Sequence, residues 1–281
     1  MTLLSELTTF KIGGPCERLY EPDSIERTIA LLKELENPVV LGGGSNILAA
    51  DEGVTHPVVR TSGLDHIEFH GTAVRAGCGA GLPELARAAA RQGLTGLEWA
   101  SGIPGSVGGA AVMNAGAYGG EMSQVVTGAL VFDGETPVTV RDFAFAYRHS
   151  IFFEYPSWTV LEVTLKLAED DPQAISARMD ELRKRRNEKQ PVSLPSAGSF
   201  FKRPPGGYAA ALIDQCGLKG LRIGGAQVSE RHSGFVVNAG GAVCEDVLRL
   251  AALVRETVYK QTSVELEPEV RLLGRDWLWN F

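Results

Sequence analysis

A glycine-dense stretch at residues 96–121 sets the strongest constraint on what this chain can fold into. The stretch reads GLEWASGIPGSVGGAAVMNAGAYGGE, and eight of its residues are glycine. A backbone with so few side chains can approach a ligand closely and can point successive amides at an anion. A flexible linker would lack apolar residues such as Trp99, Val107 and Tyr118, which require burial. The stretch therefore indicates a ligand-binding loop suited to a flat cofactor with a pyrophosphate, and its isolated polar residues are Ser101, Ser106 and Asn114.

Length and composition are typical of a soluble globular protein with two domains, or with one large domain that carries an inserted lobe. The chain has 281 residues, of which 44% are hydrophobic and 22% are charged. Its formal net charge of -7 argues against a general nucleic-acid binder, but local lysines and arginines can still hold an anionic small molecule. No apolar run reaches the length of a membrane span, and the N-terminal residues lack the basic start and apolar core of a signal peptide. We therefore expect a cytoplasmic protein with no nucleic-acid or membrane partner.

The cysteines and histidines show no spacing that indicates a metal site or a redox pair. The four cysteines lie far apart with no CxxC pair, and the five histidines form no HExxH set. We expect no bound metal, and we expect the reduced, partly buried thiols of a cytosolic protein.

Hydrophobic spacing and capping residues predict most of the regular elements. Helices are expected at residues 25–35, 82–93, 172–189, 208–216 and 244–260. Strands are expected at 39–41, in short segments of 57–77, in a hairpin over 125–140, and at 158–167, 222–238 and 264–274. The Pro-, Gly- and Ser-rich composition after residue 190 indicates the start of a second domain. The basic run at 183–186 is interpreted as a solvated helix face rather than an anion site.

A second glycine turn follows the strand expected at residues 39–41. Its residues are Gly42, Gly43, Gly44, Ser45 and Asn46. Their amides, with the serine hydroxyl and the asparagine side chain, can cradle a phosphate. The turn lacks the GxGxxG spacing and the following acidic residue of a Rossmann fold, so that fold is not expected.

Five segments occur in the order found in one enzyme family. They are the glycine stretch, YRHSIF, PSAGSFFKRP, GGAQVSERHSGFVVN and LEPEVRLLG. Together they make the chain resemble the UDP-N-acetylenolpyruvoylglucosamine reductase (MurB) family from Thr9 to Gly274, and the short link between Ile151 and Pro195 is similar to that of the type II members. The resemblance implies a flavoenzyme of peptidoglycan precursor synthesis that binds FAD and uses NADPH to reduce the enolpyruvyl ether of a UDP-sugar.

The resemblance also implies an α+β fold. It consists of a two-lobed FAD-binding domain of the vanillyl-alcohol-oxidase-like (PCMH) type and a smaller α+β substrate-binding domain. We expect the FAD-binding domain at residues 1–170, with its lobes divided near residue 60, and a connecting helix at 171–190. The substrate-binding domain is expected at 191–281, with a last strand that either closes it or returns to the FAD-binding domain. We expect a monomer.

Three residues match the catalytic positions of the family. The resemblance implies that Arg148, in YRHS, binds the substrate carboxylate with two parallel hydrogen bonds. It implies that Ser199, in SAGSF, donates a proton to the substrate α-carbon. It also implies that Glu269, in LEPEV, hydrogen-bonds the developing enolate as a neutral acid.

Each of these residues has a simpler interpretation from the local sequence alone. Arg148 would form a salt bridge at a domain interface, Ser199 would be a turn residue, and Glu269 would pair with Arg271. Glu267 lies two residues before Glu269, and the proline between them leaves their facing along the strand undecided.

The ligand contacts of the site are expected in three segments. Around FAD we expect Gly42, Gly43, Gly44, Ser45, Asn46, Ser101, Gly102, Ile103, Pro104, Gly105, Gly108, Gly109 and Asn114. Around the diphosphate and sugar of the substrate we expect Lys202, Arg222, Gln227, His232 and Asn238. The last two have alternative interpretations, His232 as a turn histidine and Asn238 as a strand-end cap.

Two positions depart from the family pattern, and two other functions remain open. Arg203 stands where the family has asparagine, and Ser233-Gly234 replaces Ala-Asn. One alternative function is an FAD-dependent sugar or alcohol oxidase on the same fold. The other is a nucleotide-sugar-binding module without redox chemistry.

Overall fold

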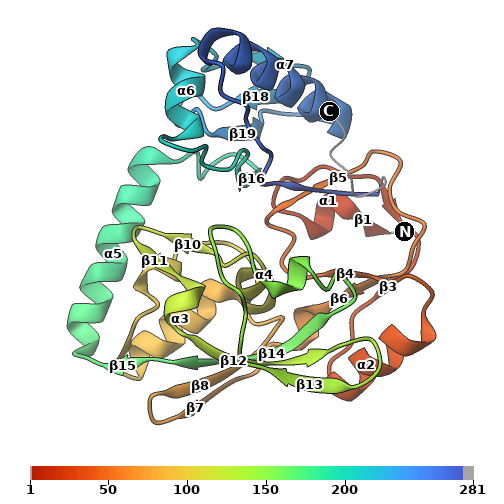
Figure 1. Ribbon diagram of the computed structural model, residues 1–281, viewed down its shortest axis with the longest axis vertical. Helices are drawn as coiled ribbons and strands as arrows, with labels where there is room; N and C mark the ends of the chain where they lie inside the picture. The colour runs from red at the N-terminus through yellow and green to blue at the C-terminus, as the bar shows by residue number, and fades with distance from the viewer. Residues whose placement is uncertain (1, 275–281) are drawn as a thin grey trace. The chain divides into compact units, whose positions relative to one another are not determined.

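The computed structural model describes residues 2–274, and within them the chain forms two compact units whose segments alternate along the sequence. Unit 1 comprises residues 2–17, 44–55 and 187–274, and unit 2 comprises residues 18–43 and 56–186. Each unit combines helices with sheets (Figure 1), which confirms the α+β class. The functional boundaries expected near residues 60, 170 and 190 stay a prediction, and residues 275–281 of the expected second domain lie outside the described residues.

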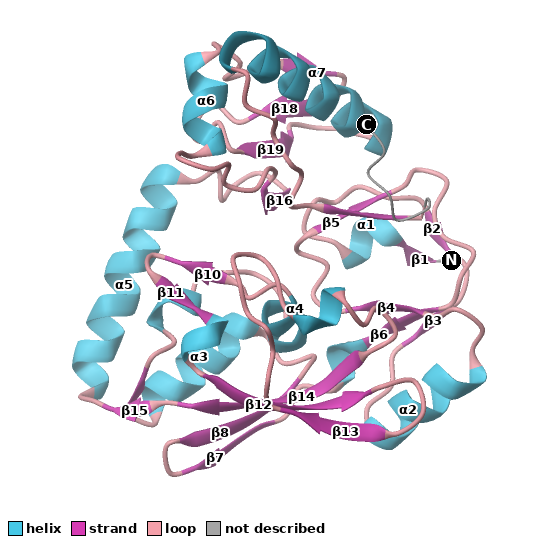
Figure 2. Cartoon of the chain, in the orientation of Figure 1, coloured by secondary structure: helices cyan, strands magenta, loops and turns pink. Residues whose placement is uncertain are grey.

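An antiparallel sheet with the strand order β13-β12-β14-β8-β7 carries the core of unit 2. Its strands are β7 (Ile67–His70), β8 (Ala73–Gly77), β12 (Val126–Phe132), β13 (Pro137–Val140) and β14 (Thr159–Lys166). Helices α3 (Leu82–Arg91) and α4 (Val107–Val112) lie over one face of this sheet (Figure 2). Helix α3 begins after Gly81 and has Pro83 in its first turn, where a missing N–H costs no helical hydrogen bond.

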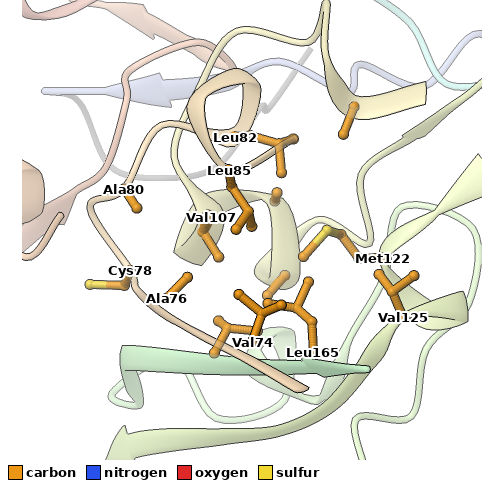
Figure 3. Close-up of a cluster of buried hydrophobic side chains, with 14 of the residues drawn as sticks. Val74, Ala76, Cys78, Ala80, Leu82, Leu85, Val107, Met122, Val125 and Leu165 are labelled. Atoms are coloured by element: carbon orange, nitrogen blue, oxygen red, sulfur yellow. The ribbon is translucent and has the colours of Figure 1, made fainter. Parts of the chain in front are cut away.

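The core of unit 2 fills the space between this sheet and its helices (Figure 3). Val74 and Leu165 point from neighbouring strands toward Leu85 of α3 and Val107 of α4, and all four side chains are fully buried. Burying each such side chain stabilises the fold by roughly 1.5–3 kcal/mol. The glycine stretch is therefore anchored on a packed core through α4.

The other elements of unit 2 include a parallel sheet with the strand order β3-β6-β4. Its strands are β3 (Leu19–Tyr20), β4 (Val39–Leu41) and β6 (Val58–Arg60), and helix α2 (Ile25–Glu34) lies between β3 and β4 in the chain. The two-stranded pairs are β9 (Leu94–Thr95) with β15 (Ala168–Glu169), and β10 (Gly116–Ala117) with β11 (Gly120–Glu121). The short 3-10 helices are η1 (Thr61–Gly63), η2 (Glu98–Ala100), η3 (Met122–Gln124) and η4 (Ile151–Phe153). Helix α5 (Pro172–Lys189) follows β15, and its last turn passes into unit 1.

Unit 1 contains an antiparallel sheet with the strand order β16-β19-β18-β17. Its strands are β16 (Ser196–Ser199), β17 (Arg222–Ile223), β18 (Ala226–Val228) and β19 (Phe235–Asn238). The helices of this part of the chain are α6 (Ala209–Gln215) and α7 (Cys244–Thr262). Helix α7 packs its buried apolar side chains, including Val247 and Val254, against β18. The unit also contains β1 (Thr2–Leu3), α1 (Leu4–Leu7), β2 (Pro15–Cys16), β5 (Ile47–Ala49) and β20 (Arg271–Leu273).

The predicted long helices and most predicted strands are confirmed, whereas the glycine stretch is more regular than a loop. It contains helix α4 and the β10-β11 hairpin. Helix α4 forms because the hydroxyl of Ser106 caps its first turn by accepting a hydrogen bond from the Gly109 N–H, and because alanines follow. Across residues 2–274, the helices are too short or too polar to span a bilayer. Cys16, Cys78 and Cys244 are buried, and Cys216 is half-buried.

A buried carboxylate lies on the unit 2 sheet, on the face opposite the core side chains Val163 and Leu165 of β14. Glu162 of β14 is 5% exposed, and Arg75 of β8 donates to both of its oxygens, at 2.9 and 2.8 Å. His66 Nε2 lies 2.9 Å from Glu162 Oε2. Burial opposes the charged form, but the hydrogen bonds from Arg75 and His66 outweigh it, so the pKa of the Glu162 carboxyl lies below its usual value.

We expect Glu162→Gln to lower the free energy of unfolding at pH 7 by about 1–3 kcal/mol, because a buried charged hydrogen bond is lost. A carboxyl whose folded-state pKa is depressed contributes stability above its unfolded pKa and loses it as the pH falls through the folded pKa. The difference between wild type and variant should therefore shrink below about pH 4.5. Urea unfolding of wild type and variant at pH 7 and below about pH 4.5 measures this difference in the free energy of unfolding.

The exposed Glu68 provides a matched control for this prediction. Its carboxylate lies 3.7 Å from Arg75 and its side chain is half exposed, so Glu68→Gln should change the free energy of unfolding by less than about 0.5 kcal/mol. A Glu162→Gln effect that stays equally large under acid conditions would contradict the assignment to the ionised carboxylate.

Candidate active site

The glycine turn after β4 lies directly against the glycine stretch within unit 2. A Cβ added to Gly42 would lie 2.5 Å from Ser106 Oγ, and one added to Gly43 would lie 2.7 Å from the Cα atom of Gly105. The Gly43 N–H donates to Ser106 Oγ at 3.3 Å. Two glycine-rich segments thus approach each other closely, as the lack of a Cβ allows, and glycine-rich turns of this kind commonly hold a phosphate. These residues fit the pyrophosphate of a dinucleotide cofactor.

Ser106 lies within the segment expected around FAD, and it joins the two glycine turns. Its hydroxyl accepts hydrogen bonds from Gly43 and from Gly109, and its side chain is buried. A serine directly before a helix is an N-cap signal, and this signal could have indicated its capping role.

The second half of the expected phosphate turn belongs to unit 1. Gly44 has a φ of 61°, and a Cβ there would lie 2.1 Å from the Leu7 carbonyl oxygen, so only glycine fits. Asn46 Nδ2 donates to the Glu269 carbonyl oxygen at 3.0 Å. Gly44, Ser45 and Asn46 are thus grouped with the segment around Glu269, whereas Gly42 and Gly43 are grouped with Ser106.

The other expected cofactor residues lie along the glycine stretch of unit 2 with mixed exposure. Ser101 Oγ donates to the Glu98 carbonyl oxygen at 2.7 Å, and a Cβ at Gly102 would lie 3.0 Å from Arg186 Cδ. Arg186 is half-buried, unlike the exposed residues 183–185, and burial lowers its pKa. The exposed members are Pro104 and Gly109, the half-buried members are Ile103 and Gly105, and the buried members are Gly108 and Asn114.

Arg148 occupies a tight turn beside the glycine stretch. Ala146 and His149 exchange two backbone hydrogen bonds of 3.2 and 3.1 Å, so the turn holds only Tyr147 and Arg148, and Arg148 has a φ of 52°. Its Nη1 donates to the Asn114 carbonyl oxygen at 3.4 Å and its Nη2 to the Gly116 carbonyl oxygen at 3.2 Å. The guanidinium is therefore directed over the glycine stretch.

Ser199 and Glu269 come together within unit 1. Ser199 ends β16 directly after Gly198, whose φ of 81° marks the irregular pairing of this strand, and the serine is exposed. The next residue, Phe200, accepts a 2.8 Å hydrogen bond from the Glu269 N–H. The segments that carry the expected proton donor and the expected enolate partner therefore run side by side, whereas Arg148 belongs to unit 2.

The structure also separates Glu267 from Glu269. Glu267 forms an ion pair with Lys202 and is exposed, whereas Glu269 is half-buried. Lys202, which was expected to contact substrate, forms this ion pair because residues 200–202 pair with residues 267–269, and its contact with substrate stays a prediction.

Cross-strand pairing places two of the expected substrate residues on the same sheet face as Ser199. Ser199 pairs with Phe235, and Gln227 pairs with both Val237 and Arg222. Since directly paired residues and residues two apart share a face, all five lie on the face opposite α7. The arrangement brings Ser199, Gln227 and Arg222 to one surface.

His232 and Asn238 match their simpler interpretations. His232 Nδ1 accepts a hydrogen bond from the Gly234 N–H at 3.2 Å, its ring packs edge-on against Phe235, and burial lowers its pKa. Asn238 Oδ1 accepts from Gly240 and Ala242, at 3.0 and 3.1 Å, and so caps the end of β19.

The two departures from the family pattern have local consequences. Arg203 lies 4.8 Å from the ring centre of Tyr208, a cation–π distance on the surface. A Cβ at Gly234 would lie 3.0 Å from the His232 ring, so a larger residue requires that ring to move.

Comparison with known sequences matches both parts of the chain. The family model described as FAD binding domain matches residues 17–139, and the model described as UDP-N-acetylenolpyruvoylglucosamine reductase, C-terminal domain, matches residues 190–273. The chain is thus an FAD-binding flavoprotein, and its α+β FAD-binding domain is of the vanillyl-alcohol-oxidase-like type.

Relatives and a solved structure agree on the family over nearly the whole chain. UDP-N-acetylenolpyruvoylglucosamine reductase of Caldanaerobacter subterraneus is 45% identical over 274 residues, which cover 95% of this chain and 90% of the relative. The reductase of Latilactobacillus sakei is 46% identical and covers 97% and 92%. The crystal structure of the reductase from Thermus caldophilus superposes with a TM-score of 0.84 at 38% identity, covering 97% of this chain and 98% of that chain. The chain belongs to the UDP-N-acetylenolpyruvoylglucosamine reductase family.

Proposed function

We propose that this protein is an NADPH-dependent flavoenzyme that reduces UDP-N-acetylglucosamine enolpyruvate to UDP-N-acetylmuramate, a step of peptidoglycan precursor synthesis, as a cytoplasmic monomer. The observation that carries the proposal is the pairing of the Ser199 and Glu269 segments in a family of known reductases. The glycine cradle of Gly42, Gly43 and Ser106 supports FAD binding.

FAD, held by the glycine turns around Gly42, Gly43 and Ser106, would supply the hydride chemistry at the β-carbon of the enolpyruvyl group, with NADPH as the source of the hydride. Negative charge then develops on the α-carbon and its carboxylate. The Arg148 guanidinium binds this carboxylate with two parallel hydrogen bonds, which strengthen as the charge accumulates and so stabilise the transition state more than the ground state.

Ser199 completes the reaction with a proton. Its hydroxyl donates to the α-carbon, so one hydride and one proton add across the double bond, and the serine oxygen regains its proton from solvent. A hydroxyl is a weak acid, but an enolate carbon held in contact with it is a strong base. Glu269, in its neutral form, donates a hydrogen bond to the enolate oxygen. Arg222 and Gln227, on the sheet face of Ser199, contribute polar contacts to the UDP-sugar.

One anaerobic titration tests the function. The visible spectrum of the purified protein should show flavin bands that bleach with NADPH and return when UDP-N-acetylglucosamine enolpyruvate is added. A flavin that reoxidises only with oxygen would identify a sugar or alcohol oxidase instead. Protein that stays colourless after incubation with FAD would identify a nucleotide-sugar-binding module.

A further inference from the structure

Asn114 was expected to contact the cofactor, but both ends of its amide are engaged by the protein backbone. The side chain is 1% exposed. Its Oδ1 accepts a hydrogen bond from the Ser123 N–H at 3.0 Å, and its Nδ2 donates to the Ala146 carbonyl oxygen at 3.0 Å. All these residues belong to unit 2, and the amide ties three chain segments together.

Asn114 contacts both the turn that carries Arg148 and the guanidinium of Arg148. Ala146, which accepts from the Asn114 amide, is the first residue of the turn that carries Arg148. At the other end, the Asn114 carbonyl oxygen accepts from Arg148 Nη1 at 3.4 Å, beside the 3.2 Å contact of Nη2 with Gly116. Asn114 therefore fixes the turn through its side chain and the guanidinium through its backbone.

The residue type suits this place for two physical reasons. Asn114 has a φ of 42°, a left-handed conformation that asparagine tolerates better than most other residues with a side chain. An amide also offers a donor and an acceptor on one planar group, whereas a carboxylate offers only acceptors. The Ser123 N–H requires the acceptor, and the Ala146 carbonyl oxygen requires the donor.

We propose that Asn114 is a positioning residue for Arg148, which orients the guanidinium toward the substrate carboxylate rather than contacting FAD. The inference rests on the proposed function, since it assigns Arg148 to that carboxylate. Arg148 has a left-handed φ of 52° and a long side chain, so its orientation needs support from neighbouring groups. A displacement of about 1 Å in a group that binds the reacting carboxylate can cost about a hundredfold in rate.

Asn114→Asp is the sharpest test, because it keeps the shape, the acceptor for Ser123 and the tolerance of the left-handed backbone while removing the donor to Ala146. We expect bound flavin and NADPH reduction to persist, while kcat/KM for the enolpyruvyl substrate falls roughly ten- to a hundredfold. Asn114→Ala, which introduces no buried charge, should behave similarly.

A double-mutant cycle with Arg148→Ala distinguishes positioning from general destabilisation. If Asn114 acts through Arg148, then Asn114→Asp should change kcat/KM by less than about twofold in the Arg148→Ala background. Thr28→Val serves as the control, because Thr28 is fully buried and its hydroxyl donates a 2.8 Å hydrogen bond to Ser24 within the same unit but in helix α2. It should lower the melting temperature without changing kcat/KM.

Three results would overturn the positioning role. Loss of flavin from both Asn114 variants would assign the residue to the cofactor, as the sequence suggested. Equal effects of Asn114→Asp with and without Arg148 would show independent action, and an unchanged kcat/KM in both variants would remove the role. If Arg148→Ala alone leaves reoxidation by the substrate unimpaired, the assignment of Arg148 in the proposed function fails instead.

Discussion

Ser199→Ala is expected to leave NADPH reduction of the bound flavin intact and to slow reoxidation by UDP-N-acetylglucosamine enolpyruvate by about 10²- to 10⁴-fold, the usual contribution of a general acid. The α-carbon then has no positioned proton donor. Ser199 is exposed at the end of β16, and its neighbours Phe200 and Phe201 are buried, so the methyl group should not disturb the core. Stopped-flow absorbance at the flavin band measures the two half-reactions separately.

Ser193 gives a matched control for this substitution. It is an exposed serine in the turn before β16, so Ser193→Ala should retain both half-reactions at the wild-type rate. If Ser199→Ala reoxidises as fast as Ser193→Ala, Ser199 is not the proton donor. A slowed reduction by NADPH would instead place the serine in the nicotinamide-dependent step.

Arg148→Ala is expected to retain FAD and to reduce the rate of reoxidation by the enolpyruvyl substrate by about 10²- to 10³-fold, the usual cost of removing a preorganised donor at a developing charge. Arg148→Lys should recover only part of the loss, because an ammonium keeps the charge but cannot form two parallel hydrogen bonds. Single-turnover reoxidation over a range of substrate concentrations measures both the binding and the chemical step.

Arg87 serves as the charge control for this prediction. It is exposed on helix α3 and pairs with Glu84 one turn away, so Arg87→Ala removes one positive charge from the same unit without touching the glycine stretch. It should leave the rate unchanged. If Arg148→Ala releases the flavin, Arg148 is a cofactor or folding residue rather than a carboxylate ligand.

Local pattern was sufficient to predict the long helices and most of the longer strands of both units. Helix α7 was expected at residues 244–260 and spans Cys244–Thr262, because Val247, Leu250 and Val254 recur at helical spacing and are buried. The family's segment order was sufficient to predict the cofactor and the class of enzyme. Helical spacing depends on residues that are close in the chain, and the family match depends on the order of whole segments. Both are visible in the sequence itself.

Contacts between distant segments could not be read in this way. The pairing of β5 with β20, more than 200 residues apart, leaves no local signal in either strand. The facing of Glu269 depends on residues 200–202 pairing with 267–269, and Asn114 appeared to be a ligand residue because its backbone partners come from other loops. A polar residue in a glycine-rich stretch can bind a ligand or can hydrogen-bond the protein's own backbone. Only its contacts in the structure distinguish these two roles.

The alternation of the two units along the chain also determines the order in which the protein can mature on the ribosome. Unit 2 has all its strands once residue 186 has emerged, whereas β5 of unit 1 must wait for β20, the last described element to be synthesised. Until then, β5 presents an unpaired edge, which is the kind of surface that associates with other nascent chains. A chain that terminates before residue 271 should therefore fold unit 2 while β5 of unit 1 stays unpaired.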